Sequence, residues 1–519
     1  MNNNAGNYVP YAAERRLGAR MTFSLVDVNA VPSVLTATSS NQLMLSEINQ
    51  TFDGIETASQ KWATIEPEGW ILDGSYGFLS ETEDNGEVGW WSNNYSNSSG
   101  VLSTTAYLQI TSSANLNSNA ITIVFDELTD NYCTDFQVIW YALSGGSYTA
   151  VKTVNVTDNQ SAVAIVKAEV NNYRRVRINF TGTNKPNRFV RVMEVVFGEL
   201  QMFGDDRIKD INFRYETSLY SESLPSNELY ITVDNHDKAY NLINPTGIYK
   251  YLMTGQGINV SIFINGTQIH MGRFYFSGSK SADNSVTAQI TGYDRNFLLD
   301  SVNYNNGRSG TWTVAEAVAD VITASGLRIE TDIPSTIASR TVKRDIPRDT
   351  SCREALRLIA QAARSLCYFS RLDILTFIEP IVGNVVDVLN YDRMTSYPEA
   401  EDTGLINYVE LTVRSDYSSG ENTYIASDIT GDEVQQSVSL DNPCAYEGQA
   451  VADWILAQCK YRLAYSVDER GNPARELEDT IQIFDAYGNS NSARVISEEF
   501  TLNTGLSGRT KAVTLLNEL

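Results

Sequence analysis

The chain has 519 residues, and at roughly 150 residues per domain this length predicts about three or four domains. Its 39 basic and 63 acidic residues give a formal charge of −24, which excludes a non-specific nucleic-acid binder because such a surface repels phosphate. Apolar residues make up 42% of the chain and charged residues 20%, as in folded soluble proteins, so global disorder is excluded.

Targeting and cysteine patterns place further limits on the chain. No stretch of 18 apolar residues occurs, and residues 1–20 lack the apolar region of a signal peptide. We therefore expect no membrane-spanning segment and no export by the Sec route. Five cysteines without any CxxC pattern indicate neither a disulfide framework nor a zinc site, and we expect buried free thiols in a reducing cytoplasm: Cys133, Cys352, Cys367, Cys444 and Cys459.

The first part of the chain reads as β structure. Residues 20–28 alternate in polarity and predict one strand. From 34 to 203, short β-like runs alternate with turn clusters rich in Asn, Ser, Thr and Gly, which predicts an all-β sandwich. Its strand candidates include 120–128, 135–143, 162–170 and 173–182. A lone strand before the sandwich indicates an insertion, so this strand should pair with strands some 200 residues later.

A second β region runs from about 205 to 300. In residues 227–235, the alternation of Leu229, Ile231 and Val233 predicts a strand with one apolar face. Another alternating run, 258–264, ends at Asn265-Gly266, a dipeptide that favours the positive φ values of a type I′ turn. The sequence therefore predicts a β-hairpin around Asn265-Gly266.

Helical signals are confined to the second half. Thr313 and Glu316 form a capping box before an apolar stripe at helical spacing, and Gly326 can end that helix. Ser351 and Glu354 repeat the capping box before a second helix, and a short strand pair over 371–380 follows it. A third helix is expected at about 446–463. The remaining strand candidates are 407–415, 479–488, 493–503 and 510–516.

Signs of catalysis are few. The chain has two histidines, His236 and His270, without the neighbours of a triad or metal site, and no HExxH, GxSxG, P-loop or GxGxxG motif. We therefore predict no catalytic, cofactor-binding or metal-binding residues and no cofactor. The open enzymatic alternative is a glycosidase-like carboxylate pair, Glu66 and Asp73 around Trp70, and a remote alternative is calcium bound by Asp73, Asp84 or Glu87.

An aromatic cluster is the one candidate binding feature. Adjacent Trp90 and Trp91 on one strand must point to opposite faces, so one of them can be exposed. With Tyr95, Trp70 and their Asn and Ser neighbours they form a candidate sugar-stacking platform. The alternative is that one tryptophan fills the sandwich core and the other meets a neighbouring domain.

Residues 233–266, the helix and strands of 348–380, and the C-terminal 498–515 together resemble tail hub proteins of tailed bacteriophages. The resemblance rests on a turn at Tyr240-Asn241 with Asn244-Pro245, the segment Arg-Glu-Ala-Leu-Arg-Leu-Ile-Ala-Gln-Ala (353–362), and a Gly-Leu-Ser-Gly turn (505–508) between the last two strands. It covers roughly 205–519 and 20–28. Separately, 34–203 resembles galactose-binding-like jelly rolls.

The resemblance implies a mainly β fold: two tail-tube-like β-barrel domains, an inserted β-sandwich (jelly roll) and a small α/β domain. The implied domains are 1–33, the N-terminal segment and first barrel strand; 34–203, the sandwich, a possible carbohydrate-binding-like module; 204–305, the rest of the first barrel; 306–400, the α/β domain; and 401–519, the second barrel with the third helix. The last residue, Leu519, leaves no region expected to carry lytic activity.

The implied function is structural and non-enzymatic. Three subunits would form the hub at the distal end of a phage tail, adapting the sixfold tube to a threefold tip and forming the genome-ejection channel. Implied partners are the distal tail and tail tube proteins, the tape-measure protein, receptor-binding or fibre proteins, and DNA that passes through without specific binding. The implied location is the virion tail tip, after synthesis in the bacterial host cytoplasm. Alternatives are an adhesin for host cell-wall glycan acting through the sandwich, and a peptidoglycan or glycan hydrolase.

Overall fold

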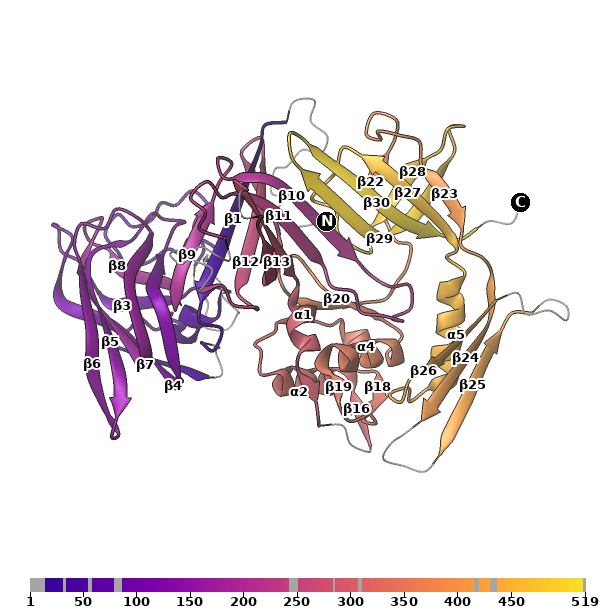
Figure 1. The fold of residues 1–519 in the computed structure, drawn as a ribbon, viewed down its shortest axis with the longest axis horizontal. Helices are drawn as coiled ribbons and strands as arrows, with labels where there is room; N and C mark the ends of the chain where they lie inside the picture. Colours follow the sequence, from indigo (N-terminus) through magenta and orange to yellow (C-terminus); the bar gives the residue numbers. More distant parts are fainter. Residues whose placement is uncertain are drawn as a thin grey trace. The chain divides into compact units, whose positions relative to one another are not determined.

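The computed structural model describes residues 15–30, 34–54, 58–78, 86–241, 251–282, 285–306, 310–414, 420–429 and 436–516. The expected mainly β fold is confirmed, because strands in several sheets far outnumber helices (Figure 1). The chain forms two compact units. One comprises residues 1–22, 202–249 and 257–519, which include the segments that carry the family resemblance, and is called the hub unit below because of that resemblance alone; the other comprises 23–201 and 250–256, and is called the sandwich unit.

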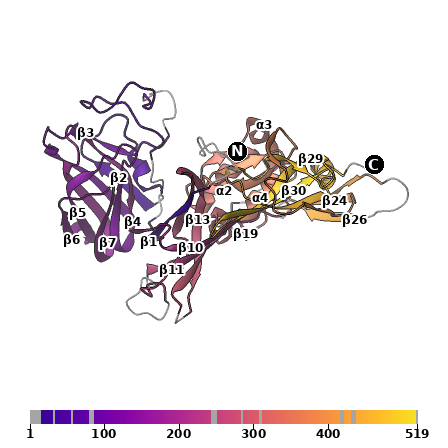
Figure 2. The same ribbon diagram turned by 90° about the horizontal axis from the view of Figure 1, so that it is seen from above.

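The sandwich unit is built on one seven-stranded sheet with the order β3-β8-β4-β7-β5-β6, in which β2 also pairs with β4 (Figure 2). Its strands are β2 (Leu35–Ser39), β3 (Trp90–Tyr95), β4 (Val101–Phe125), β5 (Cys133–Ser144), β6 (Ser147–Val156), β7 (Val163–Thr183) and β8 (Phe189–Val196). A short 3-10 helix, Ile48–Phe52, lies between β2 and β3.

Two long strands let this sheet fold over into two layers. The first half of β4 pairs with β2 and with the second half of β7, whereas its second half pairs with β8 and the first half of β7. The register of the β4–β7 pair is irregular between Thr111 and Ala120, where both strands turn from one layer to the other. Apolar residues of both halves, such as Leu108 and Ile123, face one shared core.

The hub unit is organised by a long sheet with the order β23-β27-β30-β29-β10-β11-β14-β13-β12-β1-β9, with β28 beside β29 and β22 beside β28. The strands of this sheet that come earlier in the chain form module A: β10 (Ile208–Glu216), β11 (Glu228–Asp234), β12 (Gly257–Ile264), β13 (Thr267–Lys280) and β14 (Thr287–Tyr293). The strands that come later in the chain form module B: β22 (Val385–Leu389), β23 (Glu399–Asp402), β27 (Leu463–Glu469), β28 (Thr480–Phe484), β29 (Ser490–Leu502) and β30 (Leu506–Thr514). The chain passes between its two units within β1 (Leu17–Val26) and β9 (Gly198–Phe203).

Two expectations about module A are confirmed. β12 and β13 form an antiparallel hairpin whose turn residues, Asn265 and Gly266, have φ values of 52° and 85°. β1 lies beside β12 in the sheet, and the Asn265 amide donates to the Arg16 carbonyl at 2.9 Å. The lone early strand thus pairs with a strand some 240 residues later in the chain. Asn244 and Pro245 of the resemblance lie outside the described residues.

The helices of the hub unit are α1 (Arg295–Asp300), α2 (Val314–Ser325), α3 (Ser335–Ala338), α4 (Cys352–Ala362) and α5 (Gly448–Cys459). α2 has the expected capping box of Thr313 and Glu316 and ends at Gly326 with φ 70°. At α4, the Ser351 side chain accepts from the Glu354 amide, as expected of its cap. The five cysteines are free and buried, also as expected.

Short strands surround these helices. They are β15 (Asn303–Tyr304) with β19 (Thr350–Ser351), β16 (Thr311–Thr313) with β18 (Thr341–Lys343), β17 (Thr331–Asp332) with β20 (Leu366–Phe369) and β21 (Leu375–Ile378), and β24 (Ile406–Arg414) with β25 (Glu421–Ser427) and β26 (Gln436–Asp441). One hydrophobic core contains α2, α4, β24 and α5. Packing therefore continues across the boundary expected at residue 400, because α5 and β24 bury their apolar faces with the α/β elements rather than with module B.

The final turn differs from its expected position. Leu502 pairs with Leu506 and Phe500 with Gly508, so Leu506, Ser507 and Gly508 already belong to β30. The connection is formed by Asn503, Thr504 and Gly505, and the Asn503 amide donates to the Gly505 carbonyl at 3.1 Å. A Gly-Leu-Ser-Gly turn was therefore the wrong assignment; Gly508 lies in the strand where Gly471 approaches it closely.

Candidate functional site

The structure buries the two tryptophans that were expected to form a sugar-stacking platform. The side chains of Trp90 and Trp91 are 0% and 2% exposed. They do point to opposite faces of β3, as the strand period requires: Trp90 stacks on Phe180 in the shared core, and Trp91 packs with Trp62, Val88 and Phe189. The outer face of β3 is covered by the segment that precedes it, and this cover removes both rings from solvent.

The remaining two platform residues lie in different surroundings. Tyr95 is 43% exposed and meets the edge of Phe189 at a centroid distance of 5.6 Å. Trp70, which is half-buried, meets Phe78 edge-on at 5.6 Å. With Trp90 and Trp91 buried, the four residues do not form a common exposed platform.

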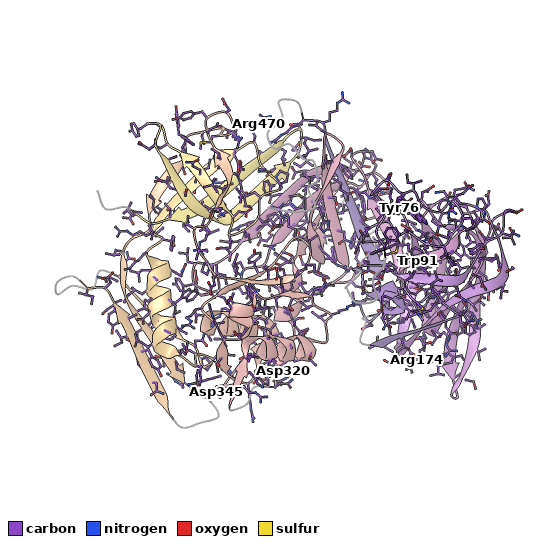
Figure 3. The ribbon with its side chains drawn as sticks, turned by 180° about the vertical axis from the view of Figure 1, so that it is seen from behind. Tyr76, Trp91, Arg174, Asp320, Asp345 and Arg470 are labelled. Atoms are coloured by element: carbon purple, nitrogen blue, oxygen red, sulfur yellow. The ribbon has the colours of Figure 1, made fainter. Side chains whose placement is uncertain are left out.

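A buried ion cluster explains both the position of Trp91 and the role of Glu66. The Arg191 guanidinium lies over the ring of Trp91, which is labelled in Figure 3, at 4.0 Å. It also contacts the Glu66 carboxylate and donates to Asp126 at 2.9 Å. Glu66 also accepts from the Phe189 amide at 2.7 Å and from the Thr64 hydroxyl at 2.6 Å. Glu66 is thus 3% exposed and fully engaged in holding strands together.

The other candidates for chemistry are not assembled into a site. Asp73 faces solvent, and hydrogen bonds from Ser75 hold the pKa of its carboxyl below the usual value. His236, 72% exposed, pairs with Asp234, whereas burial and the nearby Arg371 and Arg273 lower the pKa of His270 to about 4.

The described residues contain neither a candidate metal site nor a helix that could span a membrane. There, no three His, Cys, Asp or Glu side chains gather as a metal site would require, and Asp84 lies outside the described residues. No described helix combines the length and apolar character needed to cross a bilayer.

The feature best suited to a function is instead the seam between modules A and B. β10 and β29 pair antiparallel from Ile211–Leu502 to Glu216–Ser497, so one continuous sheet joins two modules that are some 290 residues apart in sequence. On the buried face of the seam, Phe213 and Tyr215 of β10 pack against Phe500 of β29 and Phe274 of β13. The modules are therefore joined by both backbone hydrogen bonds and an aromatic core.

The antiparallel strands β20 and β21 form a tight hairpin whose turn contacts both sides of this seam. Arg371, in the hairpin turn, lies over the Tyr215 ring at 4.6 Å and the Phe500 ring at 5.4 Å. The same guanidinium donates to the carbonyls of Pro473 and Arg475, the latter at 2.8 Å. Two residues further on, Asp373 accepts from Tyr275 at 2.8 Å and pairs with Arg295. The hairpin thus ties both modules to the helical part, and its turn with Arg371 and Asp373 is called the clamp.

A buried charge network lies beside the clamp. Arg475 is 0% exposed and contacts three carboxylates, those of Asp387, Glu469 and Glu498, and the Thr510 hydroxyl at 2.6 Å. Three carboxylates around one guanidinium leave excess negative charge in the buried interior, away from water. Burial raises the pKa of Glu498 to about 7, with Arg475 opposing and Glu469 adding to the rise. Burial likewise raises the pKa of Glu478 to about 7 although Arg494 pairs with it at 2.9 Å.

Sequence reasoning did not single out Arg371 or Arg475. Arg371 stands at the start of the strand pair predicted over 371–380, and Arg475 stands in the polar run NPARELED, 472–479. The carbonyls that accept from Arg371 lie more than 100 residues away, and the carboxylates around Arg475 come from neighbouring strands of the sheet, so no local pattern marks either residue. The one available signal was the density of charge between the helix expected at about 446–463 and the strand candidate 479–488.

Comparisons with known proteins do not show a family for this chain. No protein-family model matches the chain, and no curated protein matches its sequence. Among solved structures, a tail protein from Neisseria meningitidis MC58 is 12% identical with a TM-score of 0.43, over 60% of this chain and 94% of that one. The 43 kDa tail protein of prophage MuSo2 from Shewanella oneidensis is 13% identical with the same score and coverage. A prophage tail protein from Listeria monocytogenes EGD-e is 12% identical with a TM-score of 0.40, over 62% and 92%.

Proposed function

We propose that this chain is a structural, non-enzymatic protein of a phage tail, and that three copies form the hub at the distal end. The observation that carries the proposal is the β10–β29 seam, which fuses two β modules side by side within one sheet. Three copies then place six β modules around one axis, the arrangement that adapts a sixfold tube to a threefold tip. Closure by cyclic symmetry also gives the sheet edges a partner.

The exposed face of the long sheet has the character of a channel wall. Side chains that face away from the core on β10, β11, β23, β27, β29 and β30 are mostly polar, and the charged ones are mainly acidic: Asp210, Glu216, Glu228, Asp234, Glu399, Glu401, Asp468 and Glu499, with Lys209, Arg214, Arg509 and Lys511 as the basic members. An acid-rich face repels DNA phosphate and lets it slide past without binding. We infer that this face lines the bore.

The clamp has a mechanical role in this proposal. A passage must keep its shape under load, and Arg371 bridges the backbone of module B and the aromatic rings on both sides of the seam. The sandwich unit is proposed to be an insertion that leaves the first module after β1 and returns through β9. Its neighbours in the virion are proposed to be other tail components.

Native mass spectrometry over a range of protein concentrations, alone and with a co-expressed tail tube protein, tests the proposal. We expect a species of three times the monomer mass. A chain that remains monomeric at every concentration and in both preparations would contradict it. A variant of the seam, Phe500→Asp, should lose the trimer, whereas the matched sandwich variant Val138→Asp should impair the sandwich unit alone.

A further inference from the structure

One strand of the sandwich unit carries three arginines that the proposed function does not use. Arg174, Arg175 and Arg177 lie on β7, whose alternate residues Val176 and Ile178 are buried in the core. Arg175 and Arg177, which alternate with these buried residues, therefore project from the outer face of the layer formed by β2, β4, β7, β5 and β6. Arg174, labelled in Figure 3, precedes them beside the irregular part of the β4–β7 register. Among the described residues, none of the three pairs with a carboxylate, although the chain has 63 acidic residues against 39 basic.

Hydrogen bonds hold each arginine in place through Nε. Arg174 donates to Asn115 Oδ1 at 2.7 Å, Arg175 to Thr111 Oγ1 at 3.2 Å, and Arg177 to Asn179 Oδ1 at 3.0 Å. These bonds leave the paired Nη groups, the fork that grips a carboxylate or phosphate, without a hydrogen-bond partner in the described chain.

Aromatic rings further fix the two central guanidinium groups. Arg175 stacks on the Tyr148 ring of β6 at 3.4 Å, and Arg177 stacks on the Tyr107 ring of β4 at 3.8 Å. Stacking restricts both side chains, so less entropy is lost when a ligand binds. The two stacks spread the positive charge over β4, β7 and β6, across most of the layer.

A row of amides continues the same face. Asn179 donates to Gln137 Oε1 at 3.3 Å, and Gln137 donates to Asn155 Oδ1 at 2.7 Å, so the row crosses β7, β5 and β6. Side-chain amides both donate and accept, as sugar hydroxyls require. The nearest acid of this face on β5, Asp135, pairs opposite Gly182, roughly 16 Å along the strand from Arg177 at about 3.3 Å per residue.

We propose that this face, defined by Arg175, Arg177, Tyr107, Tyr148 and Gln137, binds an anionic glycan. Fixed guanidinium forks recognise carboxylate or phosphate groups, and tyrosine hydroxyls and amides recognise the sugar hydroxyls. Charge complementarity selects an anionic over a neutral chain, because this cluster is unpaired in a strongly acidic protein. The same net charge of −24 disfavours duplex nucleic acid as the occupant. This inference does not depend on the proposed hub function.

Affinity electrophoresis of the full-length protein tests the proposal, with four polymers in the gel: polygalacturonate, phosphomannan, neutral dextran and polyglutamate. We expect retardation by polygalacturonate or phosphomannan, and whichever retards the protein identifies carboxylate or phosphate as the anionic group. Binding should weaken with added salt. The variant Arg175→Gln/Arg177→Gln should lose affinity at least about tenfold.

The matched control is Lys167→Gln/Lys185→Gln, which removes the same charge from the same unit at side chains that are 71% and 38% exposed; it should keep its affinity. Tyr148→Ala should weaken binding to the glycan and leave the fold intact, since Tyr148 lies at the end of edge strand β6. No retardation by either anionic glycan would overturn the proposal. Equal retardation by polyglutamate or dextran, or equal loss in the lysine control, would also overturn it.

Discussion

Replacing Arg475 by methionine removes the one cation that three buried carboxylates of module B, those of Asp387, Glu469 and Glu498, share. Asp387, Glu469 and Glu498 would remain at 6%, 1% and 0% exposure, with Arg393 still beside Asp387. Breaking a buried ion pair by removing one partner typically costs about 3–5 kcal/mol, because it leaves an uncompensated charge. We expect Arg475→Met to destabilise the hub unit by about 3–5 kcal/mol at pH 8.

The cost should shrink in acid, and the sign follows from proton linkage. The pKa of Glu498 is about 7 in the folded chain against an ordinary 4.5, so between these values the folded state binds the extra proton and stability rises as pH falls. Without Arg475 this pKa rises further, and each pH unit is worth about 1.4 kcal/mol per carboxylate. We expect the destabilisation to be about 1–2 kcal/mol smaller at pH 5.5 than at pH 8.

Urea unfolding followed by hydrogen exchange in peptides of β27, β29 and β30 measures this change, because it reports on module B separately from the sandwich unit. Arg509→Met is the control: Arg509 is 51% exposed, lies 3.7 Å from Asp468, and should cost less than about 1 kcal/mol. A loss below about 1 kcal/mol for Arg475→Met at pH 8, or an equal loss at both pH values, would refute the account of Arg475 as the shared counter-charge.

Three further predictions concern the fold. Trp90→Ala should destabilise the sandwich unit by about 3–5 kcal/mol because Trp90 fills its core, whereas Tyr95→Ala should cost less than about 1 kcal/mol. Urea titration followed by tryptophan fluorescence compares the two variants, and similar losses of stability would contradict the burial pattern. Asn265→Val should destabilise the β12–β13 hairpin by about 1–2 kcal/mol, since a β-branched residue resists the φ of 52°; exchange in peptides of β12 measures it, and no change would refute the turn assignment. In the wild-type chain, buried Glu478 and Glu498 should make the unfolding temperature of the hub unit rise as pH falls from 8 to 5.5, as calorimetry can show; an unfolding temperature that stays constant or falls would contradict the raised pKa values of the two carboxylates.

Features that depend on neighbouring residues were predictable from the sequence. Asn265-Gly266 requires positive φ, and Thr313 with Glu316 satisfies the first amides of α2, so both patterns specify their local structure wherever the segment packs. The period of two also placed Trp90 and Trp91 on opposite faces correctly. What it could not show is that Trp62, Val88 and Phe189 cover the second face, because that cover comes from other segments of the chain.

Features that depend on distant pairing were not predictable. The seam joins β10 to β29 through six residue pairs, and no local sequence pattern predicts this pairing. The contacts of Arg371 and Arg475 form only when the seam brings distant segments together, so they were not predictable either. Likewise α5 was predicted as a helix, but its packing with α4 rather than with module B follows from tertiary contacts. The sequence placed Arg175 and Arg177 in the strand candidate 173–182, but the rings on which they stack, Tyr148 and Tyr107, belong to other strands.

A cryo-electron microscopy reconstruction of the assembled protein, co-expressed with a tail tube protein, tests the central claim most directly. The account predicts a threefold ring in which each subunit contributes module A and module B, with the exposed face of β10 and β29 turned toward the axis. A ring in which that face points outward, or particles that contain a single copy of the chain, would contradict it.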